Sequence, residues 1–152
     1  RIPQSSIEID YFNTCKQRVN DLSLNDNIHL RQVVETDTTY DQHPNVHSFL
    51  KGKSAIISYS EMESFHYAFA EGLCSGLEGF CRHWNGSKSI YGSYVYDNDD
   101  SMRLAILEWA KTNIEERHKK ALINNKFVVS NFGVEKITEK LIGVFKKLEP
   151  SL

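Results

Sequence analysis

The sequence has no run of 18 apolar residues and no secretory signal peptide, the features that mark membrane-spanning and secreted chains. It also has no block of basic residues, and its net charge is −2. A chain of this kind offers no extended positive surface to the phosphates of a nucleic acid. We therefore expect a soluble chain that does not bind nucleic acid.

Cysteine is scarce as well, with three residues at Cys15, Cys74 and Cys81. The number is odd and the spacing matches no disulfide framework, so free thiols in a reducing compartment are the simplest explanation. This predicts a cytoplasmic location.

Motifs for bound metals and for nucleophilic catalysis are missing. His43 and His47 have helical ligand spacing, but the sequence contains neither C-x2-C nor H-E-x2-H. Asp97 and Asp99 lack the glycine and the terminal glutamate of a calcium loop. No G-x-S-x-G, Walker A or G-x-G-x-x-G sequence occurs. We expect no metal ion and no bound cofactor.

What is present suffices for one globular domain over residues 1–152, since 40% of the residues are apolar and 11% aromatic. Periodicity and turn residues predict helices at 7–24, 44–52, 65–76, 87–92, 101–112, 115–124 and 134–148, and strands at 28–34, 55–59, 77–84 and 93–96. Alternating helices and strands are typical of a doubly wound α/β domain with a parallel sheet, here followed by C-terminal helices.

The segment 54–76 is the centre of this pattern. Residues 55–59 form a short apolar run with little polar alternation, as in a parallel strand that is buried on both faces. A polar turn follows, with Ser64 as the expected N-cap of a helix that starts at Phe65 and ends near Gly76. Ligands of α/β proteins bind outside the carboxyl ends of the strands, and the N–H groups of a helix N-terminus attract phosphate.

Two carboxylates mark this segment, Glu63 before the helix and Glu71 within it. At helical rise they lie roughly 12 Å apart. Paired glycosidase carboxylates are only about 5–9.5 Å apart, so this spacing suits two ends of one long ligand better than two groups acting on one bond. The alternative is that both are ordinary glutamates on a solvated helix face.

The segments SEMESF (60–65) and AEGLCSG (70–76) resemble the E-x7-E signature of retaining GT-B glycosyltransferases. The resemblance implies the C-terminal, nucleotide-sugar-binding domain of such an enzyme, with a Rossmann-like three-layer fold. It assigns the catalytic contact with the donor sugar to Glu63 and the ribose hydroxyls to Glu71. The backbone N–H groups of Ser64, Phe65 and His66 would meet the sugar or the diphosphate.

The resemblance also implies partners. These are a nucleotide-diphosphate sugar as substrate, an acceptor glycan, lipid or protein bound mainly by another domain, and peripheral membrane contact of the full-length protein.

The glycine-containing loop and the Arg/Lys pair of the family would precede Arg1, so the chain alone is expected to be inactive. One departure is Leu77-Glu78-Gly79, where the family has G-x-P.

Several alternatives remain open at this stage. The chain could be a GT-B relative with other chemistry, a phosphorylase or an epimerase, or a non-catalytic Rossmann-like binding module. Phe65 could belong to the core, and His66 could lie on the surface. The last helix, with an inner face of Val134, Ile137, Leu141, Val144 and Leu148, could pack across two domains or simply dock on this one.

Overall fold

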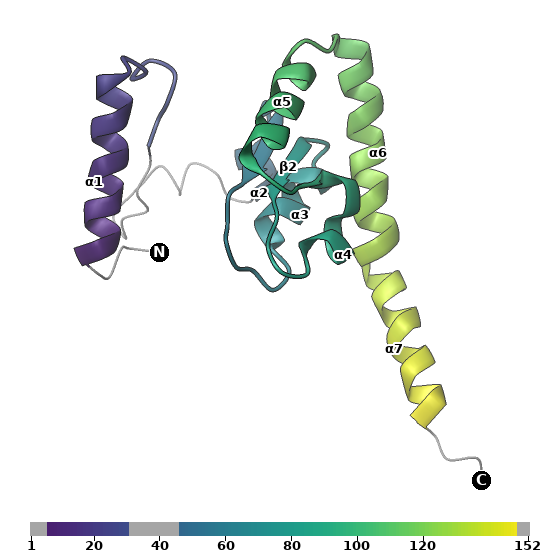
Figure 1. Cartoon of the computed structure of the whole chain (residues 1–152). Helices are drawn as coiled ribbons and strands as arrows, with labels where there is room; N and C mark the ends of the chain where they lie inside the picture. The colour runs from purple at the N-terminus through teal and green to yellow at the C-terminus, as the bar shows by residue number, and fades with distance from the viewer. Residues whose placement is uncertain (1–5, 31–45, 149–152) are drawn as a thin grey trace. The chain divides into compact units, whose positions relative to one another are not determined.

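The structure is a computed structural model that describes residues 6–30 and 46–148 (Figure 1). The chain divides into two compact units, Arg1–Pro44 and Asn45–Leu152. The single domain expected over residues 1–152 stays a prediction.

The first unit contains helix α1 (Ser6–Asp21), which confirms most of the helix predicted at 7–24. Its end is a Schellman turn in which Ser23 takes a left-handed conformation (φ 54°) and the Leu24 N–H donates to the Val19 carbonyl at 3.0 Å. Residues 28–30 form no strand, so the strand predicted at 28–34 is wrong where the structure describes it. Its remaining residues, 31–34, lie outside the described part of the chain.

The second unit is built on a parallel sheet of three strands, β1 (Ala55–Ser58), β2 (Glu78–Arg82) and β3 (Val95–Tyr96), in that spatial order. Ser58 pairs with Cys81, which pairs in turn with Val95. The central strand β2 is buried over its first four residues, because helices cover both of its faces. The predicted α/β class with a parallel sheet is confirmed.

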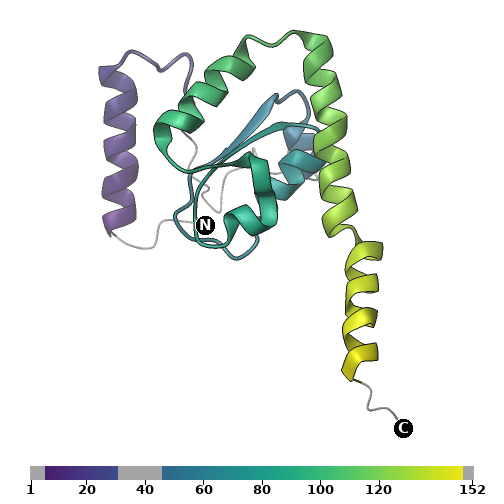
Figure 2. The ribbon, with the colours of Figure 1, turned by 45° about the vertical axis from the view of Figure 1, so that its right-hand side comes forward.

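Successive residues of β2 show which helix covers which face. A Cβ atom placed on Gly79 would lie 2.6 Å from a side chain of α3 (Tyr67–Cys74), so this helix packs directly on the strand backbone. The next side chain, Phe80, contacts the ring of Trp109 in α5 (Asp99–Ala110), with ring centroids 6.0 Å apart. Because neighbouring strand residues point to opposite faces, the sheet lies between α3 and α5 in three layers (Figure 2).

Helix α3 ends where the sequence predicts. Gly76 has φ 84°, a conformation that glycine adopts at little cost. Its N–H donates to the Leu73 carbonyl at 2.9 Å, and the Leu77 N–H donates to the Gly72 carbonyl at 3.1 Å. These two bonds form a Schellman motif, which turns the chain from the helix into β2.

The start of α3 differs from the prediction. The helix begins at Tyr67, not at Phe65, and its N-cap is His66 in a left-handed conformation (φ 61°), not Ser64. The reason is a distant contact, because the hydroxyl of Tyr91 donates to the Phe65 carbonyl and keeps it out of the helical hydrogen-bond pattern, so that the His66 carbonyl is the first to accept helical hydrogen bonds.

The remaining elements of this unit are α2 (Val46–Leu50), α4 (Ser87–Tyr91), the 3-10 turn η1 (Gly92–Tyr94), α6 (Ile114–Phe132) and α7 (Val134–Leu148). Helix α6 is longer than the predicted segment 115–124, and it packs against α3 and β2. The predicted connection at 35–42 and the predicted helix start at Pro44 lie outside the described residues.

A buried amide fixes α6 to the sheet. Asn124 is fully buried, and its Nδ2 donates to the Leu77 carbonyl at 2.8 Å and to Glu78 Oε2 at 3.3 Å. Its Oδ1 accepts a hydrogen bond from the Tyr94 hydroxyl at 2.7 Å. Lys120 Nζ lies 3.6 Å from Glu78 Oε1 and balances this buried carboxylate. One side chain of α6 thereby joins the start of β2 to η1.

Of the two alternatives for the last helix, docking on this domain is wrong, whereas packing across two domains stays a prediction. Helix α7 forms, but none of its residues is buried. The face predicted to pack inward is exposed, and in both views the helix continues beyond the end of α6, away from the sheet (Figures 1 and 2).

We predict that Asn124→Ala destabilises the fold by about 2–5 kcal/mol, since it leaves two or more buried polar groups without a partner and each costs about 1–3 kcal/mol. Urea unfolding followed by circular dichroism measures this. Asn131→Ala is the matched control, because Asn131 lies in the same helix, is exposed, and donates only to the Phe127 carbonyl at 2.8 Å. Equal losses in the two variants would show that the buried network contributes no more than the single exposed hydrogen bond of Asn131.

We also predict a loss of stability at alkaline pH. Burial, with a smaller contribution from Glu78, raises the pKa of Tyr94 from 10 to about 12. The unfolded chain therefore releases this proton at a lower pH than the folded chain, so stability is complete below pH 10 and falls by roughly 2 kcal/mol at pH 12. Tyr94→Phe should be less stable at pH 7 but should lose less stability between pH 10 and 12. Parallel urea titrations of both proteins measure the two slopes, and equal slopes would contradict the prediction.

Candidate functional site

Ligands of α/β domains bind at the carboxyl edge of the parallel sheet. Strand β1 ends at Ser58 and β2 ends at Arg82. A loop follows β1 and leads into α3, as the sequence predicts, but it covers residues 59–66 and not only 60–64. This strand, loop and helix hold all five predicted site residues.

Glu63 lies in this loop and is half-buried. Its Oε1 accepts a hydrogen bond from the Ser60 hydroxyl at 3.0 Å, which orients the carboxylate. Burial is the main cause of a raised pKa at both Cys81 and Tyr91, and the charge of Glu63 is the smallest contribution in each case. Glu63 therefore acts electrostatically on buried groups of β2 and α4.

Tyr91 fixes the end of the loop. It is fully buried, and its hydroxyl donates to the Phe65 carbonyl and lies 3.1 Å from the His66 carbonyl. Burial is the main cause of a raised pKa at Tyr91, and electrostatic interaction with Cys81 and Glu63 adds to it. The phenol therefore keeps its proton over the whole physiological range and stays a hydrogen-bond donor to the loop.

Phe65 is part of an aromatic cluster. Its ring meets Tyr67 edge-on with centroids 5.1 Å apart and Phe132 at 5.0 Å. Edge-to-face pairs of this kind stabilise by about 0.5–1.5 kcal/mol beyond the area they bury. The side chain thus anchors the loop on α6, and its predicted contact with a substrate stays a prediction.

His66 shapes the helix start through its backbone. Its carbonyl accepts from the Phe69 and Ala70 N–H groups at 3.1 and 3.2 Å, and its ring lies 5.9 Å from the Phe69 ring. A non-glycine residue with positive φ is uncommon, and such residues cluster at functional sites. No side chain caps α3, and the neighbouring Ser64 is exposed. The first N–H groups of the helix remain suited to an anion.

Glu71 lies in α3, one turn after Tyr67, and both side chains are on the exposed face of the helix. The opposite face, with Phe69 and Leu73, is completely buried. The two glutamates thus differ in environment, because Glu63 is half-buried at the sheet edge and Glu71 is open to solvent. Among the described residues, no interaction joins Glu63 to Glu71.

Ser58, Cys81 and Trp84 form a buried cluster of side chains that the sequence did not predict. Ser58 and Trp84 are each 3% exposed, and Cys81 between the strand ends is completely buried. Burial raises the pKa of the Cys81 thiol, and the nearby Ser58 and Trp84 side chains partly oppose this. Within the described chain, neither Ser58 Oγ nor Trp84 Nε1 makes a hydrogen bond of good geometry. The cluster can be recognised only from the pairing of Ser58 with Cys81, and this strand register cannot be predicted from the sequence.

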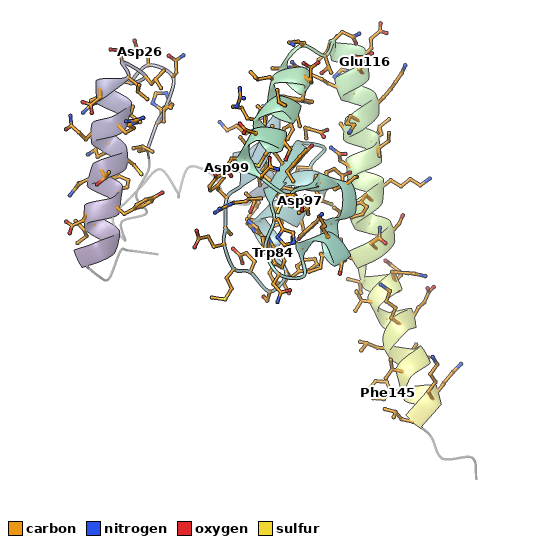
Figure 3. All side chains as sticks on the ribbon, viewed as in Figure 1. Asp26, Trp84, Asp97, Asp99, Glu116 and Phe145 are labelled. Atoms are coloured by element: carbon orange, nitrogen blue, oxygen red, sulfur yellow. The ribbon has the colours of Figure 1, made fainter. Side chains whose placement is uncertain are left out.

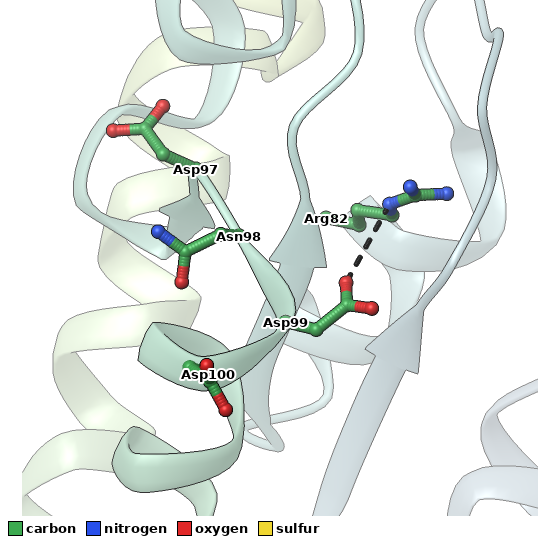
Figure 4. A pocket seen from close by; sticks show the side chains of 5 residues that line it. All are labelled: Arg82, Asp97, Asn98, Asp99 and Asp100. Carbon is green, nitrogen blue, oxygen red and sulfur yellow. Dashed lines mark ion pairs between the residues drawn. The ribbon is translucent and has the colours of Figure 1, made fainter.

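An open hollow of about 400 Å³ lies at the carboxyl ends of β2 and β3, lined by Arg82 and residues 97–100 (Figure 4). Arg82 and Asp99 point toward one another with Nε and Oδ1 3.8 Å apart, and Arg82 also pairs with Glu61 at 3.3 Å. The Asp97 carboxylate points away from Arg82. The hydrogen bond from Lys88 lowers the pKa of Asp97.

This hollow has its charges largely paired, and the N-terminus of α5 beside it is already capped, because Asn98 Oδ1 accepts from the Ser101 N–H at 2.9 Å. Across residues 6–30 and 46–148, no group of histidine, cysteine and carboxylate side chains could hold a metal ion. The uncapped N-terminus of α3 is therefore the better place for an anionic ligand.

Comparison of the chain with protein-family models, with curated proteins and with solved structures found no match.

Proposed function

We propose that the chain provides the nucleotide-sugar-binding part of a retaining glycosyltransferase with a GT-B, Rossmann-like architecture. The observation that supports this best is the loop of residues 59–66. The Tyr91 hydroxyl pins its end, Ser60 orients Glu63 within it, and it leads into the uncapped N-terminus of α3 at the carboxyl edge of a parallel sheet. The E-x7-E spacing thus falls on a strand, loop and helix of the type that binds such donors.

In this proposal the two glutamates serve opposite ends of the donor. Glu63 contacts the sugar and stabilises its positive charge as the diphosphate leaves. Glu71, open to solvent on α3, accepts hydrogen bonds from the ribose hydroxyls. The backbone N–H groups of Ser64, Phe65 and His66 lie near the diphosphate. Preorganised charges and dipoles of this kind stabilise a transition state because they need no reorganisation during the reaction.

The proposal includes the expected partners. The donor is a nucleotide-diphosphate sugar, and the acceptor is a glycan, lipid or protein held mainly by another domain. We also propose a cytoplasmic location, no bound cofactor and no nucleic-acid partner. None of the described helices has the length and apolar character needed to cross a membrane.

We predict that Glu71→Gln in the intact protein weakens binding of the nucleotide about ten- to a hundredfold, because a charge-assisted hydrogen bond contributes roughly 1.5–3 kcal/mol. Isothermal titration with UDP and GDP measures this. Glu71 is exposed, so circular dichroism should show an unchanged fold. Unchanged affinity for both nucleotides would remove Glu71 from the site.

We predict that Glu63→Ala in the intact protein reduces the initial rate of sugar transfer much more than it reduces affinity for the free nucleotide, which has no sugar to contact. Rate and affinity are measured on one preparation, with the anomeric configuration of the product determined by NMR. Glu61→Gln is the matched control, since Glu61 is an exposed carboxylate of the same loop that pairs only with Arg82 among the described residues.

Equal losses of rate and affinity in Glu63→Ala would show that Glu63 has no special role at the sugar. Nucleotide binding without sugar transfer would favour a non-catalytic binding module, and a phosphorolysis or epimerisation product would favour a GT-B relative with other chemistry.

A further inference from the structure

The start of α3 is a point at which local preference and a distant contact disagree. By local preference the helix begins at Phe65 with Ser64 as its N-cap, since serine ranks among the best N-cap residues. In the structure it begins at Tyr67, after a left-handed His66 (φ 61°) that provides no side-chain cap. Conflicts of this kind are expected at functional or strained sites, because the rest of the fold must hold the locally less favoured form.

The hydrogen bonds of the first turn are close to those of a longer helix. The Phe69 N–H donates to the His66 carbonyl, three residues back, at 3.1 Å, and the Ala70 N–H donates to the same carbonyl at 3.2 Å. In a helix that begins at Phe65, the Ala70 bond stays and the Phe69 N–H donates to the Phe65 carbonyl instead. The two starts of α3 therefore differ by a small rearrangement of the backbone.

The hydroxyl of Tyr91 opposes this rearrangement. Tyr91 is completely buried and ends α4, the short helix that follows Trp84, which is labelled in Figure 3. Its hydroxyl donates to the Phe65 carbonyl and keeps this carbonyl out of the helical hydrogen-bond pattern. Its ring packs on the Phe69 ring with centroids 5.0 Å apart, which holds the hydroxyl at the start of α3.

The contributions to the two forms have opposite signs and similar sizes. The longer helix gains an N-cap from Ser64 and releases His66 from a left-handed conformation. It loses the hydrogen bond from Tyr91 and disturbs the contact between the Phe65 and Phe132 rings, whose centroids lie 5.0 Å apart. Each contribution changes an equilibrium constant by roughly tenfold. Removal of a single hydroxyl is therefore enough to change which form is favoured.

We propose that α3 has a two-state start and that Tyr91 is the positioning residue that keeps it in the shorter form, in which the donor site is assembled. In the shorter form, the N–H groups of Tyr67 and Ala68 have no carbonyl of the helix to bind and are suited to an anion. In the longer form, Ser64 caps the helix, the Ala68 N–H donates to the Ser64 carbonyl, and the loop that carries Glu63 ends at Ser64.

The two-state start regulates the site, because an anion that binds the first N–H groups of the shorter form draws the population toward that form. Its ligand rests on the proposed function, whereas the two forms of the helix do not depend on that function. The structural and the binding measurements are therefore made separately.

The structural experiment compares Tyr91→Phe with the unmodified full chain by NMR. Backbone chemical shifts and amide–amide NOEs of Phe65 and His66 distinguish the two forms without any ligand. We expect helical values for both residues in Tyr91→Phe, and slower amide exchange at Ala68, which gains an acceptor. Tyr94→Phe is the matched control, because it also removes a buried hydroxyl, one that donates to Asn124, and it should leave the start of α3 unchanged.

The binding experiment is isothermal titration of the intact protein with UDP and GDP. Tyr91→Phe should weaken nucleotide binding about tenfold, because the competent form becomes the minor one, and Tyr94→Phe should not weaken it. Adding His66→Gly to Tyr91→Phe should restore most of the affinity, since glycine adopts the left-handed conformation at little cost. A merely structural role of Tyr91 predicts no such recovery.

A left-handed His66 in folded Tyr91→Phe, or the same change at the start of α3 in Tyr94→Phe, would overturn the two-state start. A longer helix with unchanged nucleotide affinity would overturn the positioning role of Tyr91. His66→Gly alone, with Tyr91 in place, should raise the urea midpoint of unfolding, and a lower midpoint would contradict the proposal even if Tyr91→Phe does not fold. An unmodified protein that binds neither nucleotide would refute the proposed function, and the NMR comparison would still decide between one and two starts.

Discussion

The side chain of Tyr91 in α4 connects three other parts of the second unit. It donates to the loop after β1, its ring packs against Phe69 of α3 with centroids 5.0 Å apart, and Phe132 of α6 meets it at 6.1 Å. A loop of mostly polar residues has little apolar surface of its own to hold it. The buried phenol replaces water as the donor to the Phe65 carbonyl, and this decides where α3 begins.

How much of the fold could be predicted from the sequence depends on how far apart in the chain the residues that determine each feature lie. The unit of β1, α3 and β2 follows from local patterns, since an apolar run, a helical stripe and Gly76 are adjacent in the chain. The start of α3 could not be predicted, because Ser64 is a better N-cap than His66 by local chemistry. The competing contact comes from Tyr91, 25 positions later.

The distinction between local patterns and distant contacts also explains the other differences between the predictions and the structure. The apolar stripe of α7 correctly predicts a helix, but periodicity does not say what covers the stripe, and in the described chain nothing buries it. Residues 28–30 have strand-like composition, yet β-propensity reflects packing against neighbouring strands more than an intrinsic preference. The group of Ser58, Cys81 and Trp84 required the strand register. Of the candidate site, the positions of Glu63 and Glu71 relative to β1 and α3 were predictable, whereas their different exposure was not.

Charge sets a condition on the proposed function. The carboxyl edge of the sheet has Glu63 in the loop and Asp97, Asp99 and Asp100 beyond β3, whereas Arg82 is already paired with Glu61 and Asp99. A diphosphate brought to this edge meets carboxylates at close range, and the partial charge of about +0.5 at the N-terminus of α3 does not balance it alone. Donor binding therefore requires further cations at this edge, and the arginine and lysine that the family resemblance implies are groups of that kind. Glu63 would then face the sugar on the far side of the phosphates, where a carboxylate stabilises the developing positive charge.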